Sequence, residues 1–314
     1  MNKVIFFWIK IAVAAIILGL MFYKVKPELI WSALRSARYD MVAVGLLLMP
    51  LNIWLQEAKW RYLVKLVFPN IKSVDTIGSL LGGMALGIVT PGRIGEYGRG
   101  LFLKQGKPHN VLGLIVIDKF YNLGCTIAFG LPALMTLPWA VDLIKGHLFI
   151  SMLVLLASID IVLLYLALDP KPVRSLIYAL QIMFPRGDKI AQLAYGLDRF
   201  NSPQARTTLL YTLAHYLVFL LQYFVLISGF AGLDFITSAR GAASVLFAKS
   251  ALPIAIADLG IDQLVSVQFF GQFGAPAEAA FNASLLLFAM NVLIPALLGL
   301  LFIGRLRIGK NKVD

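Results

Sequence analysis

The chain has 314 residues, of which 60% are hydrophobic and only 14% are charged, and its mean hydropathy is +0.83. Soluble domains carry about a quarter charged residues, so the composition predicts an integral membrane protein, and the net charge of +12 fits contact with anionic headgroups better than nucleic-acid binding. A single cysteine excludes an internal disulfide and a cysteine-based metal cluster, and three scattered histidines argue against a histidine metal site. We therefore expect no metal, no cofactor and no nucleic-acid partner.

Six segments have the length and apolarity of full membrane spans, which need about 20 residues. They cover residues 4–23, 41–63, 111–137, 147–168, 207–230 and 280–303. No small-residue cleavage site follows the first segment, so we interpret it as a retained helix and not as a signal peptide.

Two further apolar stretches, residues 75–89 and 239–257, are shorter and rich in Gly, Ala and Ser. Each ends at a Pro- or Gly-containing break that is followed by charged residues. Short, interrupted apolar segments are typical of re-entrant or discontinuous helices. The sequence therefore predicts an all-α polytopic protein with about six spans and two re-entrant helical hairpins.

The distribution of Lys and Arg predicts the orientation, because cytoplasmic loops carry an excess of both. With both termini in the cytoplasm, the amphipathic connector at 169–206 is cytoplasmic too, and the basic residues are concentrated on the inside. The whole chain, 1–314, then forms one transmembrane domain with two halves, about 4–137 and 147–303. The first half starts inside and the second outside, which predicts an inverted-topology repeat in the cell membrane.

The stretch TPGRIGEYGRG, residues 90–100, breaks an apolar helix at Thr90-Pro91-Gly92 and brings in three ionisable side chains, Arg93, Glu96 and Arg99. Unpaired backbone groups cannot face lipid, so this break is expected to be buried in protein or to line a wet cavity. A helix that restarts near Ile94 would direct its N-terminal amides, together with the arginines, at an anion. These features predict a phosphate-sized anion site on the cytoplasmic side.

A simpler interpretation stays open for the same residues. Arg93 and Arg99 could be ordinary positive-inside residues at headgroup level, with Glu96 paired to Arg99 or to the helix end at Gly100. That interpretation accounts for the charge but not for the Pro-Gly break.

The second short stretch has the opposite electrostatic character. Asp258, Asp262 and Glu278 follow it on the predicted outer side, near Lys249 and Arg240. If the inner end of the transport path is basic and the outer end more acidic, the protein would capture an anionic headgroup on the inside and discourage its return from the outside. This hypothesis predicts that Arg93 matters for capture and Asp258 for release.

Several charged residues fall inside or at the ends of predicted spans, where charge is costly and usually has a partner. Asp118 and Lys119 are adjacent and point about 100° apart on a helix, so we expect Lys119 to pair with Glu96, and Asp118 with Arg93 or Arg99. Glu57, Lys59 and Arg61 lie at the end of the second span. We interpret them first as a boundary cluster beside two interface anchors, Trp54 and Trp60.

The stretch TPGRIGEYGRGLFLKQG, followed by IDKFYNLG, resembles the transmembrane region of lysylphosphatidylglycerol synthases and their stand-alone relatives. LPIAIADLGIDQ in the second half is similar to the partner motif. The resemblance implies two related halves that move a lipid between leaflets. The family often has an Arg-Glu pair in the second motif, where this chain has Ala257-Asp258, and this departure leaves the identity of the lipid open.

Residues that match the two motifs, together with the intramembrane charges, make up the predicted substrate-binding set. The set is Pro91, Gly92, Arg93, Gly95, Glu96, Arg99, Asp118, Lys119, Lys249, Pro253, Asp258 and Gly260.

We expect a flippase, not an enzyme, that acts on an anionic, aminoacylated or polyprenyl-linked membrane lipid; no catalytic residue is predicted. The aminoacyl-transferase domain of the bifunctional relatives is not in this sequence, and it has no Gly-x-x-x-x-Gly-Lys-Ser/Thr nucleotide motif. The alternatives are a transporter of a small soluble anion, a membrane enzyme that modifies lipid headgroups, and a scaffold for a lipid-modifying enzyme partner. A homo-oligomer is compatible with each of these.

Overall fold

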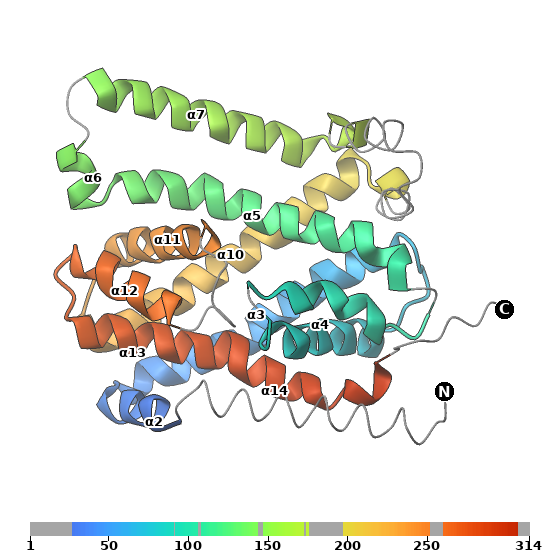
Figure 1. The fold of residues 1–314 in the computed structure, drawn as a ribbon, viewed down its shortest axis with the longest axis horizontal. Coiled ribbons are helices and arrows are strands. Elements are labelled where there is room, and N and C mark those ends of the chain that lie inside the picture. The colour runs from blue at the N-terminus through green and yellow to red at the C-terminus, as the bar shows by residue number, and fades with distance from the viewer. Residues whose placement is uncertain are drawn as a thin grey trace.

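The computed structural model describes residues 27–90, 92–105, 108–143, 147–172, 174–175, 197–251 and 260–306. Every regular element in these ranges is a helix, which confirms the all-α prediction. Long helices run lengthwise through the molecule, and shorter helices lie between them at both ends (Figure 1).

Five helices in the described ranges are long and apolar enough to cross a membrane. They are α3 (Tyr39–Lys65), α5 (Leu112–Met135), α7 (His147–Leu168), α10 (Ser202–Ala231) and the continuous run of α13 (Ala277–Phe288), η4 (Ala289–Leu293) and α14 (Ile294–Leu300). They confirm five of the six predicted spans. The predicted span at 4–23 lies outside the described residues.

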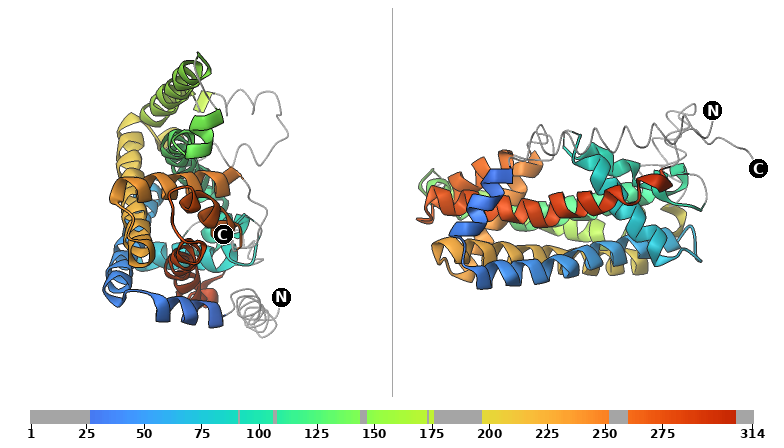
Figure 2. Two further views of the ribbon diagram at one scale, coloured as in Figure 1. Left: turned by 90° about the vertical axis from the view of Figure 1, so that its left-hand side faces the viewer. Right: turned by 90° about the horizontal axis from the view of Figure 1, so that it is seen from below.

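The two longest helices, α3 and α10, lie side by side and run in opposite directions (Figure 2, right). Their 27 and 30 residues correspond to about 40 and 45 Å at 1.5 Å per residue. Each contributes to both large apolar clusters: Val42 and Leu226 pack in one cluster, and Trp60 and Ala205 in the other. This helix pair therefore connects the two halves of the core.

The two predicted interrupted segments form short helices at opposite ends of the bundle (Figure 1). At one end are α4 (Ser73–Gly87) and the 3₁₀ helix η1 (Ile94–Phe102); at the other are α11 (Phe235–Ala251) and α12 (Ile261–Gly271). The 15 residues of α4 reach about 22 Å, less than the ~30 Å hydrocarbon core of a bilayer.

Glycines allow α4 to pack closely against α14. A Cβ on Gly299 would lie 2.0 Å from the carbonyl oxygen of Leu81, and one on Gly78 would lie 2.6 Å from the Phe302 ring. Beyond α14, Arg305 donates to Asp75 at 3.0 Å and ties this end of the bundle to the first turn of α4. Small residues at such contacts are typical of membrane helix pairs.

The remaining elements are short. They are α2 (Pro27–Ser36), η2 (Pro108–Val111), α6 (Pro138–Leu143), η3 (Leu197–Arg199) and η5 (Ile303–Arg305). In α2, Trp31 is exposed and Ala33 is buried, as expected for an amphipathic connector. Most of the predicted connector at 169–206 lies outside the described residues.

Local signals fix the turn between α10 and α11. Gly232 ends α10 in the left-handed region, with a φ of 62°, where glycine carries no steric penalty. Asp234 then accepts hydrogen bonds from the amides of Ile236 and Thr237, at 2.9 and 3.1 Å. Hydrogen bonding from Thr237 lowers the pKa of the exposed Asp234 carboxyl below its usual value.

Candidate functional site

The break after α4 turns the chain back so that η1 packs along α4. Thr90 holds the turn: its hydroxyl donates to the Gly87 carbonyl at 3.0 Å and accepts from the Gly95 amide at 2.7 Å. Gly92 and Arg93 both adopt positive φ angles, 55° and 56°. Arg93 is the one non-glycine residue with a positive φ in the described part of the chain, and such strain is concentrated at functional sites.

Glycines at this turn make room for the charged side chains. A Cβ on Gly83 would lie 2.6 Å from Cβ of Arg99, and one on Gly87 would lie 2.7 Å from Cγ of Glu96. A Cβ on Gly95 would meet the Leu86 carbonyl at 2.2 Å. These glycines therefore let η1 approach α4 closely, with Glu96 and Arg99 buried between the two helices.

Asp118 of α5 lies between two cations that come from distant parts of the sequence. Its carboxylate is 2.9 Å from the Arg99 guanidinium and 2.8 Å from the Lys59 ammonium, and all three side chains are at most 6% exposed. Lys59 also donates to Asn122 at 2.6 Å and to Thr212 at 3.3 Å. This group joins α3, η1, α5 and α10.

Trp60 and Ser79 support Arg99 from the other side. The guanidinium lies 3.6 Å from the centroid of the Trp60 ring, a cation–π contact. The Trp60 indole donates to the Ser79 hydroxyl at 3.1 Å, and that hydroxyl donates to the Arg99 carbonyl at 2.8 Å. Trp60 is 0% exposed, so the prediction that it anchors the interface is wrong. Trp54 is exposed, and its role as an interface anchor stays a prediction.

Glu96 forms a second group of the same kind. Its two carboxylate oxygens pair separately with Arg93 and with Lys119. The Lys119–Glu96 pair and the Asp118–Arg99 pair were both expected from the sequence. Arg93 pairs with Glu96, three residues along η1, and not with Asp118.

Together, the two groups contain more positive than negative charge. Each carboxylate is bracketed by two cations, so each group has a formal excess of one positive charge among the described residues. The Nε atoms of Arg93 and Arg99 are buried and find no hydrogen-bond partner in the described ranges. A buried cation without full compensation is costly, so the arrangement favours an additional anion.

Arg93 also lines a partly open, polar pocket of about 90 Å³, well above the ~10–15 Å³ that holds one water molecule. Helices from both halves of the chain form its walls. The lining residues are Asn52, Gln56, Met84, Arg93, His215, Phe219, Lys249, Asp262, Leu287, Phe288, Asn291 and Val292.

Two buried asparagines direct polar atoms without a partner into this region. The Asn52 carbonyl oxygen accepts from Gln56 at 2.7 Å and lies 3.1 Å from the His215 ring nitrogen, but its amide nitrogen has no partner within the described residues. Asn291 donates to Gln222 at 2.8 Å, and its carbonyl oxygen is likewise without a partner there. Asn291 lies in η4, a π-helical turn, a feature found frequently at functional sites.

The second half contributes one ion pair to the pocket. Lys249 of α11 lies 3.0 Å from Asp262 of α12, and both side chains are largely buried. Gly260 precedes α12 with a φ of 91°, a backbone angle that glycine tolerates best. Asp262 therefore lines the same pocket as Arg93, whereas the sequence predicted that the acidic residues of the second half form a separate acidic region on the outer side. Glu278 is exposed and lies beside α2, away from this pocket.

Three predicted site residues, Pro91, Pro253 and Asp258, lie outside the described residues. The others fall into three neighbouring groups: the Glu96 group with Gly92, Arg93, Gly95 and Lys119; the Asp118 group with Arg99; and the Lys249–Asp262 pair with Gly260 before it. The Gly95 amide is occupied by Thr90. The charged side chains, more than the helix amides, are thus what the site offers to an anion.

Sequence reasoning missed Lys59, Asn52 and Asn291. Lys59 was assigned to a boundary because the predicted span ended at 63, but α3 continues to Lys65 and Lys59 is only 2% exposed. Its neighbour Glu57 is also buried, and it accepts from Thr76 at 2.5 Å. The available signal was the interruption of an apolar span by polar residues, at 52 and at 57–61, which indicates an inward-facing polar face.

A family model described as "Lysylphosphatidylglycerol synthase TM region" matches residues 7–299. No curated protein and no solved structure matches the chain significantly. The matched range includes both short-helix segments, four of the helices suited to spanning a membrane in full, and the fifth up to its last residue, Leu300. The chain is therefore a multi-pass membrane protein that belongs to the lysylphosphatidylglycerol synthase TM-region family.

Proposed function

We propose that this protein moves a membrane lipid with an anionic headgroup between leaflets and that Arg93 binds the headgroup phosphate in the polar pocket. The observation that carries the proposal is the excess positive charge of the Arg93–Glu96–Lys119 group beside that pocket. Family membership is consistent with a lipid-related role.

The polar atoms of the pocket suit a phosphate ester with further polar groups attached. Arg93 supplies a guanidinium with an unused Nε–H, and the Asn52 amide supplies a second unused donor. Guanidinium groups bind phosphate through paired hydrogen bonds. The Asn291 carbonyl oxygen and the Asp262 carboxylate are acceptors on the opposite helices, where they would meet hydroxyl or amino groups of the headgroup.

The arrangement of the short helices supports a transport cycle with access from two sides. We propose that α4–η1 and α11–α12 are two re-entrant hairpins that enter from opposite faces and belong to two inverted repeats. Their positions at opposite ends of the bundle support this (Figure 1). Both termini would then lie in the cytoplasm and the protein in the cell membrane, as the distribution of basic residues predicts.

The alternatives make different demands on the same pocket. A transporter of a small soluble anion would use Arg93 in the same way but would need no path for acyl chains. A scaffold for a lipid-modifying enzyme would need neither transport nor a buried anion site. The excess charge at Arg93 favours anion binding, and the apolar surroundings of the pocket favour a lipid as its source.

The proposal is tested with the purified full chain in liposomes that contain a trace of fluorescent phosphatidylglycerol. Dithionite added outside destroys fluorescence only in the outer leaflet. If the protein moves the lipid, the fraction destroyed rises with protein content, and Arg93→Gln lowers the initial rate at least about tenfold, as expected for loss of a charged hydrogen bond. Arg35→Gln, at an exposed position on α2, is the matched control and should leave the rate unchanged.

Two further measurements separate the alternatives. Liposomes loaded with inorganic phosphate test the soluble-anion function, and fluorescent phosphatidylcholine tests for unselective scrambling. Phosphate efflux without lipid movement would overturn the lipid proposal in favour of the soluble-anion transporter. If neither substrate moves, transport of phosphatidylglycerol and of phosphate is excluded, the proposal is overturned for these substrates, and a scaffold or lipid-modifying function is favoured.

A further inference from the structure

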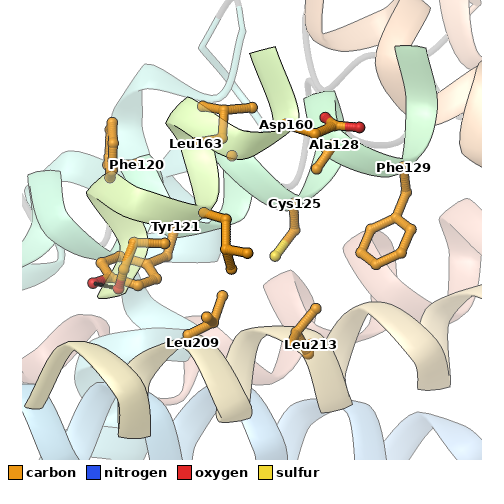
Figure 3. Close-up of a pocket in the computed structure, with 12 residues that line it drawn as sticks. Phe120, Tyr121, Cys125, Ala128, Phe129, Asp160, Leu163, Leu209 and Leu213 are labelled. Atoms are coloured by element: carbon orange, nitrogen blue, oxygen red, sulfur yellow. Dashed lines mark hydrogen bonds between the residues drawn. The ribbon is translucent and has the colours of Figure 1, made fainter. Parts of the chain in front are cut away.

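A second pocket, separate from the Arg93 pocket, lies between α5, α7 and α10 and has a volume of about 250 Å³ (Figure 3). Most of its lining is apolar or aromatic. The lining residues are Phe120, Tyr121, Gly124, Cys125, Ala128, Phe129, Asp160, Leu163, Leu164, Ala167, Leu209 and Leu213.

Asp160 is the one charged side chain among these residues, and it lies in the middle of α7. Residues 148–168 contain no other Asp and no Glu, Lys, Arg or His. Asp160 is a half-buried residue, and its carboxylate makes no ion pair or hydrogen bond within the described part of the chain. A carboxylate inside a membrane helix is costly and usually faces a partner, so this one lacks the partner that its position calls for.

The polar atoms nearby do not fill that role. The Tyr121 hydroxyl donates to the Ala167 carbonyl at 2.8 Å, which ties α5 to α7. In Figure 3, Phe129 and Asp160 lie at the same end of the pocket, with the Phe129 ring directed toward α10, and this ring stacks on Tyr216 with centroids 5.1 Å apart. Aromatic faces beside a carboxylate favour an organic cation over a metal ion.

We infer that this pocket binds a single-chain membrane amphiphile with an ammonium group, whose nitrogen pairs with Asp160 and whose hydrocarbon chain occupies the apolar part. Charge complementarity selects this occupant. An uncharged chain would leave the carboxylate without a partner, and an anionic amphiphile would be repelled. The helix that carries Asp160 has only 6% of its span buried in the protein, so such an amphiphile reaches the pocket from the bilayer. The inference does not depend on the proposed transport of an anionic lipid.

The inference is tested by measuring saturable binding of radiolabelled tetradecyltrimethylammonium to the full chain in phosphatidylcholine nanodiscs. The binding to nanodiscs without protein is subtracted. Unlabelled tetradecyltrimethylammonium should compete at least about fivefold better than tetradecanol or tetradecyl sulfate, because only the cation pairs with the intramembrane Asp160 carboxylate. Asp160→Asn should abolish this preference. Asp142→Asn, at an exposed acid on the neighbouring short helix α6, is the matched control and should retain it.

Cys125 provides a check on location, since it is the single cysteine of the chain and its sulfur lies in the pocket (Figure 3). The bound cation should slow alkylation of Cys125 by N-ethylmaleimide. Gly124→Leu should block binding even if Asp160→Asn folds poorly, because a Cβ on Gly124 meets nothing within 4 Å and the larger side chain fills the cavity. Gly271→Leu, equally unobstructed, is its control. Equal competition by tetradecanol, or full binding to Gly124→Leu, would overturn the inference.

Discussion

Arg93 and Lys249 line the same polar pocket, although one directly precedes η1 in the first half of the chain and the other lies near the end of α11 in the second. Each is paired with a carboxylate from its own half, Glu96 and Asp262 respectively. The Glu96 carboxylate also pairs with Lys119, so the first half contributes the excess positive charge. This asymmetry makes Arg93 the centre of the proposed anion site.

The backbone at Arg93 separates its role in stability from its role in binding. Because Arg93 has a φ of 56°, Arg93→Gly removes conformational strain of about 1 kcal/mol and should not lower the unfolding temperature. The same change should abolish movement of phosphatidylglycerol. Thermal unfolding in detergent and the dithionite assay measure the two effects, and transport by the Arg93→Gly variant at the wild-type rate would contradict the proposed site.

The Lys59–Asp118–Arg99 group should behave as one energetic unit. Asp118→Asn leaves two buried cations without a carboxylate and is expected to cost about 3–5 kcal/mol of unfolding free energy. Adding Lys59→Met should recover part of that loss, because one unpaired charge is removed. A double-mutant cycle by chemical denaturation in mild detergent measures the coupling. Strict additivity of the two changes would show that Lys59 and Asp118 do not interact as the geometry indicates.

Sequence patterns predicted the spans well because a bilayer of fixed thickness demands long apolar runs, and α5, α7 and α10 have them. The Lys119–Glu96 pair could also be predicted, since an intramembrane charge needs a nearby partner. The partners of Lys59 could not be predicted from the sequence in this way. Its partners Asp118 and Thr212 are 59 and 153 positions away in the sequence, and only the packing of α3 against α5 and α10 brings them together.

The pocket itself was beyond sequence reasoning for a similar reason. Asn52 is one of the polar residues that interrupt its apolar span, and Asn291 lies in an otherwise apolar one, but they line the same pocket only because α3 and η4 meet there. The π-helical turn at Asn291 has no signature in the sequence. The predicted separation of basic and acidic regions rested on loop charges alone. It did not anticipate that Asp262 would turn inward to pair with Lys249.

Two glycines of η1 provide a matched test of the close approach between η1 and α4. Gly95→Ala would place a Cβ 2.2 Å from the Leu86 backbone carbonyl, which cannot move easily, whereas Gly98→Ala meets only the end of the Leu86 side chain at 3.1 Å. We expect Gly95→Ala to destabilise the protein by about 1–3 kcal/mol and Gly98→Ala by much less. Equal unfolding temperatures for the two variants would refute the packing described at this turn.

Neutralising Asp262 should strengthen anion binding. Asp262→Asn frees Lys249 from its partner and adds a second uncompensated cation to the pocket, so half-saturation should occur at roughly three- to tenfold lower phosphatidylglycerol content. Tighter holding should also slow release and lower the maximal rate. Initial rates over a series of lipid contents separate the two effects. Weaker apparent binding in Asp262→Asn would indicate that Asp262 assists the headgroup and does not oppose it.

The most direct test of the central claim is an experimental structure of the full chain in nanodiscs of phosphatidylglycerol. The account predicts a lipid phosphate in the pocket, within hydrogen-bond distance of the Arg93 guanidinium and between Asn52 and Asn291. A pocket that holds only water, with lipid phosphates confined to the membrane surface, would contradict it.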